Sequence, residues 1–108
     1  MNTIYKYDLN ITDRQILQLP VDAQILSIQQ QNTTPVYGAD GRPVLNNTLQ
    51  LWALVDPDAA LEQRHFIIVG TGNPMPDGAA GYHLATVVTA GGALVWHIFE
   101  EVANGPID

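Results

Sequence analysis

The sequence contains no cysteine, which excludes disulfide bridges, thiolate nucleophiles and thiolate-bound zinc. Serine occurs only as Ser27, in the apolar context Ile-Leu-Ser-Ile and without the glycines of a nucleophile elbow. No apolar run approaches the roughly 18 residues of a membrane span, and no positively charged start precedes an apolar stretch. We therefore expect a soluble intracellular protein that does not contact membranes.

Positive charge is scarce as well. Four cations stand against eleven carboxylates, so the formal net charge is −7. The cations are Lys6, Arg14, Arg42 and Arg64. Four scattered cations cannot form the basic surface that phosphate binding requires, which argues against direct nucleic-acid binding. The carboxylates are also too dispersed for a mimic of DNA, so a solvated acidic surface is the preferred interpretation.

Long helical periodicity is also absent. Short runs rich in β-branched and aromatic residues follow one another instead, separated by turn residues. The runs are residues 3–9, 15–19, 23–31, 49–55, 66–69, 82–88 and 94–102. They predict an all-β fold of six or seven short antiparallel strands, arranged as a small sandwich or a barrel-like meander. We expect a single domain over residues 1–102 and a flexible tail at 103–108.

Two of these runs, Leu49–Val55 and Phe66–Val69, have large apolar side chains at both odd and even positions. A strand with one buried face alternates, so these runs predict central strands that are covered on both sides. We expect the residues between them to close a long hairpin. Asp56-Pro57 suits a helix start, so the prediction allows at most one short helical turn near residues 57–63.

A polar segment over residues 32–48 interrupts the strands. Asp40-Gly41 is a strong hairpin signal, and it is flanked by Val36-Tyr37 and Val44-Leu45. We predict a protruding β-arm at about residues 33–48, with its tip near 38–42, that extends the ladder of the strands on either side. The alternative is a disordered insertion.

Residues 70–81, GTGNPMPDGAAG, combine four glycines with two prolines. The Gly-x-Gly start suggests a dinucleotide-binding fingerprint, but Met75 occupies the third glycine position and no amphipathic helix follows. We reject that interpretation and predict a structured loop.

The last two strands are joined by a predicted tight turn at Gly91-Gly92. A two-residue loop there sets the register, and a three-residue loop would change every partner. The predicted pairs are His97 with Thr86, His83 with Glu100, and Tyr82 with Glu101.

In this register His83 and His97 point to opposite faces, which argues against a metal shared with His65. The acidic residues Asp56 and Asp58 lack the alternating spacing of a calcium loop. No metal site and no cofactor are therefore predicted.

The remaining aromatic, acidic and histidine residues do not form a recognisable catalytic group. Trp52 and Trp96 are predicted to be core anchors rather than ligand platforms. A weak hypothesis is a hydrolase that uses His97 with Glu100 or Asp56, but the protein is not expected to be an enzyme.

Four segments of the chain are distinctive: IYKYDLNITDRQILQLPVDAQILSIQQQN, LWALVDP, RHFIIVGTGNPMP and GGALVWHIFE. In this order they resemble a family of small proteins encoded by tailed phages and prophages. Family members often carry Glu at the position of Asp8, and residues 33–48 are longer than their usual connection. The resemblance implies a phage-related context in the cytoplasm of a bacterial host. It brings no catalytic residues.

The first functional hypothesis is an accessory protein that binds a host protein and inhibits a defence or regulatory component. The predicted partner-binding residues are Val36, Tyr37, Asp40, Arg42, Asp56, Asp58 and Glu62. An acidic arm would steer the protein onto basic partners. A homodimer through an edge strand or the arm is a further expectation.

The alternative hypothesis is a module that binds a small molecule or nucleotide under the 70–81 loop. Backbone amides of residues 70–72 would be the donors, and Tyr82 or Trp96 would stack on the ligand. The predicted ligand-binding residues are Gly70, Thr71, Gly72, Asn73 and Tyr82.

Overall fold

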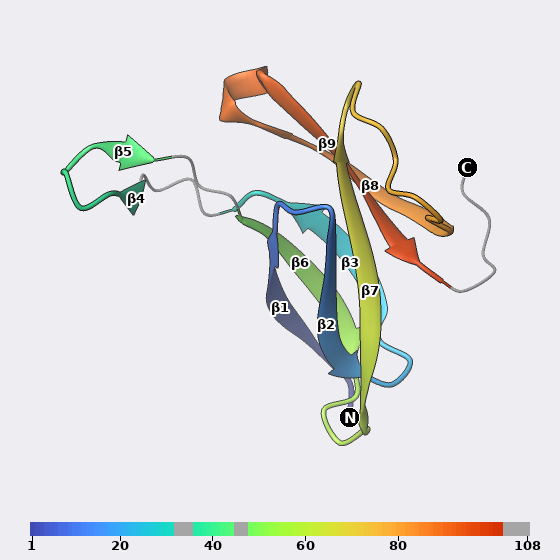
Figure 1. Cartoon of the computed structure of the whole chain (residues 1–108). Coiled ribbons are helices and arrows are strands. Elements are labelled where there is room, and N and C mark those ends of the chain that lie inside the picture. The colour runs from blue at the N-terminus through green and yellow to red at the C-terminus, as the bar shows by residue number, and fades with distance from the viewer. Residues whose placement is uncertain (32–35, 45–47, 103–108) are drawn as a thin grey trace.

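The computed structural model describes residues 1–31, 36–44 and 48–102, in which seven strands form two antiparallel sheets packed against each other (Figure 1). One sheet contains, in spatial order, β1 (Thr3–Asn10), β6 (Thr48–Val55) and β3 (Gln24–Gln29). The other contains β2 (Arg14–Pro20), β7 (Leu61–Gly70), β9 (Leu94–Glu101) and β8 (Gly81–Thr89). The prediction of a small all-β sandwich is confirmed.

A smaller hairpin stands apart from both sheets in Figure 1. It pairs β4 (Val36–Tyr37) with β5 (Pro43–Val44), and its turn covers residues 38–42, where the arm tip was predicted. Residues 32–35 and 45–47, which include the rest of the predicted arm, lie outside the described residues. The predicted tail at 103–108 does so as well.

The hairpin predicted between β6 and β7 is wrong, because the two strands belong to different sheets. β6 pairs with β1 and β3, whereas β7 pairs with β2 and β9. Each strand therefore hydrogen-bonds along both of its backbone edges. An inner position suits a strongly apolar strand, because both edges of its backbone are paired and its inner face packs on the core.

A tight turn at residues 56–60 carries the chain from one sheet to the other. Asp58 N donates to Asp56 Oδ1 at 3.0 Å, and Ala59 N donates to the Asp56 carbonyl at 3.1 Å. The aspartate side chain thus closes a local turn instead of starting a helix. β7 begins already at Leu61, and the single helical segment of the described chain is a short 3-10 turn, Ala90–Gly92.

No helix in the described residues is long and apolar enough to cross a membrane.

The two sheets share one core. Every second residue of β6 points inward, and the facing strands supply large aliphatic and aromatic side chains. The largest members, all fully or almost fully buried, are Leu9, Leu19, Leu49, Leu51, Val55, Phe66, Ile68 and Ile98. The core therefore forms from residues far apart in the chain.

The outer face of β7 is buried as well. Ile67 and Val69 form a second small cluster with Phe99, and Met75 and Ala79 from the 71–80 loop pack against it. The prediction that this strand is covered on both sides is confirmed.

Coverage of the outer face of β6 is weaker than predicted. Trp52 and Leu54 on that face are only half-buried, because no element of the described chain packs over them. Trp96 is also half-buried, and its indole N–H donates to Thr89 Oγ1 at 2.9 Å. Trp96 packs against the core, as predicted, whereas Trp52 is not the core anchor that was predicted.

The β8–β9 ladder contains a β-bulge that the sequence analysis missed. From Ala85 to Thr89, β8 follows the predicted register, so Thr86 faces His97. Before Ala85 the register shifts by one residue. The observed pairs there are Tyr82 with Glu100 and His83 with Phe99, so the predicted pairs of His83 with Glu100 and Tyr82 with Glu101 are wrong.

A bulge also changes the face that a side chain occupies, because one extra residue reverses the alternation. His83 and His97 consequently lie on the same outer face of the four-stranded sheet, with Thr86 between them. The prediction that the two histidines point to opposite faces is wrong for this reason.

Arg64 and Glu100 form an ion pair on the inner face of the four-stranded sheet. Arg64 Nε and Nη2 donate to the two carboxylate oxygens at 2.6 and 2.7 Å, and the side chains are only 16% and 17% exposed. Arg64 Nη1 also donates to the carbonyl of Ala23, which follows β2. The hydrogen bond to Glu100 raises the pKa of Arg64, so the guanidinium stays charged.

We predict that Glu100→Gln lowers the free energy of unfolding by about 3 kcal/mol, because it leaves a largely buried guanidinium without a counter-charge. Glu101→Gln is the matched control. Glu101 meets Arg14 at 3.1 Å on the surface, and an exposed pair of this kind contributes less than about 1 kcal/mol. Urea denaturation measures both variants, and equal losses would contradict the structural role of the inner pair.

Candidate functional site

Several connections gather at one end of the sandwich, which we call the loop end (Figure 1). The strand registers place them together: β1 ends beside the start of β6, and β7 ends beside the starts of β2 and β9. The loop end comprises residues 11–13, the hairpin of residues 36–44, the turn at 90–93 and the start of the 71–80 loop, which then runs over the outer face of the four-stranded sheet to β8. The opposite end carries the turns at residues 21–23 and 56–60.

The hairpin of residues 36–44, which we call the arm, presents an aromatic side chain to solvent. Tyr37 is 64% exposed. The turn is closed by Gly38 N donating to the Arg42 carbonyl at 2.9 Å and by Gly41 N donating to the Gly38 carbonyl at 3.0 Å. Arg42 N also donates to Asp40 Oδ1 at 3.1 Å, and Gly41 adopts a φ of +76° that suits glycine. These hydrogen bonds close the turn of the arm without using the side chain of Tyr37.

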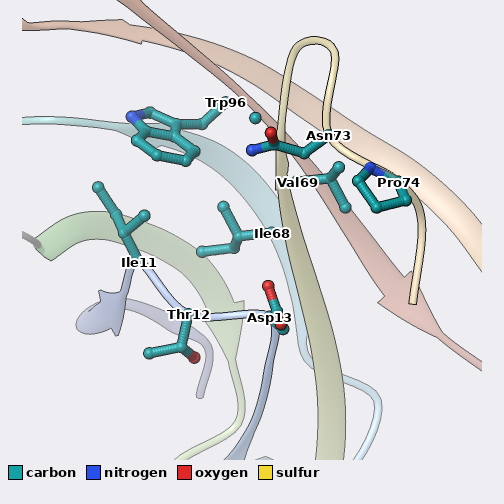
Figure 2. Close-up of a pocket in the computed structure, with 9 residues that line it drawn as sticks. Ile11, Thr12, Asp13, Ile68, Val69, Asn73, Pro74 and Trp96 are labelled. Carbon is teal, nitrogen blue, oxygen red and sulfur yellow. The ribbon is translucent and has the colours of Figure 1, made fainter. Parts of the chain in front are cut away.

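A hollow of about 120 Å³ opens between the sheets at the loop end (Figure 2). Trp96 and Ile68 line it from the four-stranded sheet, Ile11 lines it from the β1–β2 turn, and the side chain of Asn73 reaches toward Trp96. A Cβ atom at Gly70 would lie 2.9 Å from the side-chain nitrogen Nδ2 of Asn73 and 3.2 Å from the Trp96 ring. Glycine at this position allows both side chains to approach the strand closely.

A second hollow, which we call the outer cleft, lies on the outer face of the four-stranded sheet and has a volume of about 230 Å³. It shares the wall formed by residues 69, 70 and 73 with the first hollow. Val69, Phe99 and Met75 supply its apolar surface, while Thr71 and His97 supply polar side-chain atoms. The mixture of apolar surface and a few polar groups resembles a ligand site, but the volume lies below the roughly 300–1,000 Å³ of pockets for drug-sized ligands.

Most of the predicted ligand-binding residues lie at the outer cleft. Residues 70–73 all line it, as the alternative hypothesis expected. Tyr82 lies at the other end of β8, and Trp96 lines the hollow between the sheets instead. The Thr71 amide already donates to the Val95 carbonyl at 3.1 Å, so it is not the ligand donor that was predicted.

A chain of hydrogen bonds runs from the outer cleft across the surface of the sheet. Thr71 Oγ1 lies 2.7 Å from His97 Nε2, and Thr86 Oγ1 lies 3.2 Å from His97 Nδ1. The same Thr86 hydroxyl lies 3.1 Å from His83 Nε2. Both ring nitrogens of His97 are therefore engaged, which fixes the orientation of its imidazole.

The structure separates the groups that the hydrolase hypothesis combined. His97 lies on the outer face of its sheet, whereas Glu100 lies on the inner face with Arg64. Asp56 lies at the opposite end of the sandwich. Within the residues that the structure describes, no group of three or more His, Asp or Glu side chains forms a metal site.

The predicted partner-binding residues divide between the two ends. Val36, Tyr37, Asp40 and Arg42 belong to the arm. Asp56, Asp58 and Glu62 lie at or next to the opposite turn. The eight residues of β6 lie between the two groups, which corresponds to about 26 Å along the strand. A third hollow of about 370 Å³ opens at the opposite end, beside Asp56 and Ala59. The arm is the better candidate for an interface because it presents the exposed ring of Tyr37.

A comparison with known families adds one finding. The family model of DUF7352, a domain of unknown function, matches residues 1–107. The chain belongs to the DUF7352 family. No curated protein and no solved structure matches it. For this DUF7352 member, the function has to be inferred from the geometry of the loop end.

Two features of this DUF7352 chain were missed by sequence reasoning. The sequence analysis used Met75 only to reject the dinucleotide-binding fingerprint, although its side chain lines the outer cleft. The bulge that brings His83 next to His97 has one signal in the sequence. Leu84 and Ala85 are adjacent apolar residues that break the alternation of β8, and both pack against the core. Two adjacent inward residues in a strand require a bulge.

We predict that Met75→Ala lowers the free energy of unfolding by about 1–2 kcal/mol, less than a fully buried methionine, because it uncovers the outer cluster of β7. Asp77→Ala is the control in the same loop. Its side chain is exposed, and its backbone carbonyl still accepts a hydrogen bond from Arg14 Nη2 at 2.8 Å. Urea denaturation and amide hydrogen exchange in β7 measure the effect. The packing role of the loop is refuted if both variants exchange alike.

Proposed function

We propose that this protein is a non-enzymatic accessory module that binds a protein of a bacterial host through the loop end. The resemblance to tailed-phage proteins supports a partner in the host cytoplasm, in particular a defence or regulatory component that the module inhibits. The arm is the principal contact in this proposal.

The exposed ring of Tyr37 is the observation that carries the proposal. Tyrosine is enriched among the residues that dominate binding energy, because its ring buries a large area and its hydroxyl can still pair. The arm is already folded by its own backbone hydrogen bonds. Binding therefore costs less conformational entropy than the ordering of a disordered segment.

Charge supports a basic partner. The formal net charge is −7, and two of the four cations are engaged close to the arm or the 71–80 loop: Arg42 meets Asp40 at 3.6 Å and Arg14 meets Glu101. A negative field of this kind accelerates encounter with a positively charged surface and weakens as salt rises.

We predict that Tyr37→Ser reduces capture of the partner by more than about tenfold, as expected for a central aromatic anchor. The measurement is affinity purification from a bacterial host, followed by binding kinetics with the partner identified by mass spectrometry. Tyr82→Ser is the matched control, because Tyr82 is also largely exposed, at 49%, but lies away from the loop end. Loss of binding in both variants, or in neither, would contradict the assignment of the arm.

A second candidate function is the binding of a small molecule in the outer cleft. The observation that favours it is the convergence of residues 70–73 with Thr71 Oγ1, His97 and an apolar wall in one cleft. A nucleotide-like ligand would place an apolar ring against Met75 and Phe99 and its polar edge on Thr71.

A thermal-shift screen of nucleotides and related metabolites tests this second function. A ligand that binds the folded state raises the melting temperature. The rise should disappear in Asn73→Ala, which alters the cleft wall, and persist in Tyr82→Ser. If no compound in the screen raises the melting temperature of the unmodified protein, the second function is rejected.

A further inference from the structure

The two histidines of the last hairpin come together only because of the β8 bulge. His83 precedes the bulge and faces Phe99, while His97 on β9 faces Thr86 beyond it. The ring centroids of the histidines lie 6.5 Å apart, with an angle of 45° between the planes. Bulges commonly re-aim a side chain near a functional site.

Two imidazole nitrogens converge on one point of the surface. His83 Nε2 and His97 Nδ1 lie 3.1 and 3.2 Å from the same Thr86 hydroxyl. A hydroxyl can bridge two neutral imidazoles, since it accepts from one ring N–H and donates to the other ring nitrogen. A divalent cation offers a stronger way to satisfy the same two nitrogens, because each neutral imidazole has one lone pair to donate.

We propose that His83 and His97 form a binding site for a late first-row divalent transition-metal ion, such as Zn²⁺, Ni²⁺ or Cu²⁺. The ligand atoms are His83 Nε2 and His97 Nδ1, and water completes the coordination. Imidazole nitrogens favour these metals over the hard cations Mg²⁺ and Ca²⁺. Metal–nitrogen bonds of about 2.1 Å are about 1 Å shorter than the present hydrogen bonds, so the ion replaces the Thr86 hydroxyl as the partner of both nitrogens.

Both rings are already oriented for this role. If His97 binds the metal through Nδ1, its Nε2–H donates to Thr71 Oγ1, which lies 2.7 Å away. Such a partner on the second nitrogen is the usual companion of a metal-bound histidine, because it fixes the tautomer and the ring plane. His83 is held differently: the edge of its ring packs against buried Phe99, with centroids 5.3 Å apart and an angle of 70°.

The surrounding charge also favours a cation. The formal net charge of the protein is −7. The four cations have partners elsewhere among the described residues, and none of these partners is a histidine. The pairs are Lys6 with Gln31, Arg14 with Glu101, Arg42 with Asp40, and Arg64 with Glu100. A negative overall field concentrates cations near the surface.

Calorimetric titration of the full chain with Cu²⁺ alone and with Zn²⁺ alone tests the proposal. We expect one site per chain, and we expect His83→Gln and His97→Gln each to weaken binding by at least about tenfold, since loss of a mere orienting partner already costs this much. His65→Gln is the control, because His65 is exposed on the same sheet but faces Glu101 on β9. Electron paramagnetic resonance of the Cu²⁺ form should show two imidazole nitrogens, and one in each of the first two variants.

A measurement on the unmodified protein guards against misfolded variants. Zn²⁺ added to the ¹⁵N-labelled chain should shift the signals of residues 83–86 and 97–99 before any others. The proposal is overturned if these signals do not move, if the titration shows no site, or if His65→Gln weakens binding as much as the other two substitutions. Because the metal site involves no residue of the arm, its failure leaves the proposed partner binding intact.

Discussion

The structure depends on burying two strongly apolar strands, β6 and β7, without leaving their backbone edges unpaired. If β6 and β7 paired with each other in one sheet, their apolar faces would lie side by side and could not pack against each other. The fold instead makes each one an inner strand of its own sheet and turns the inner faces into a common core. The largely buried charges of Arg64 and Glu100 fit this apolar arrangement because each is the counter-charge of the other.

This arrangement decides where function can be located. Antiparallel pairing in both sheets brings most connections to two ends. The start of the 71–80 loop lines two hollows at the loop end, whereas the arm stands apart from them on the side of the three-stranded sheet (Figure 1). The acidic turn after β6 lies at the other end, about 26 Å away, so dissolved salt screens its charge at the loop end.

One inserted residue has a large effect on the surface chemistry. With regular pairing throughout β8, His83 would point into the sandwich and His97 away from it. The bulge brings both histidines and Thr86 onto the outer face, beside the apolar wall of the outer cleft. A local irregularity of the ladder thus creates a polar cluster from residues that regular alternation would separate.

The sequence by itself determined the strands, the tip of the arm at Asp40-Gly41, the ordered 71–80 loop and the pairing of Thr86 with His97. These depend on alternation and turn chemistry, which act over a few neighbouring residues. Only the tertiary structure decided that β6 and β7 belong to different sheets, that Arg64 meets Glu100, and that His83 joins His97. The first two depend on the partner that each strand finds in the folded chain, which no local pattern encodes. The third depends on a bulge whose local trace is the adjacent inward pair Leu84-Ala85.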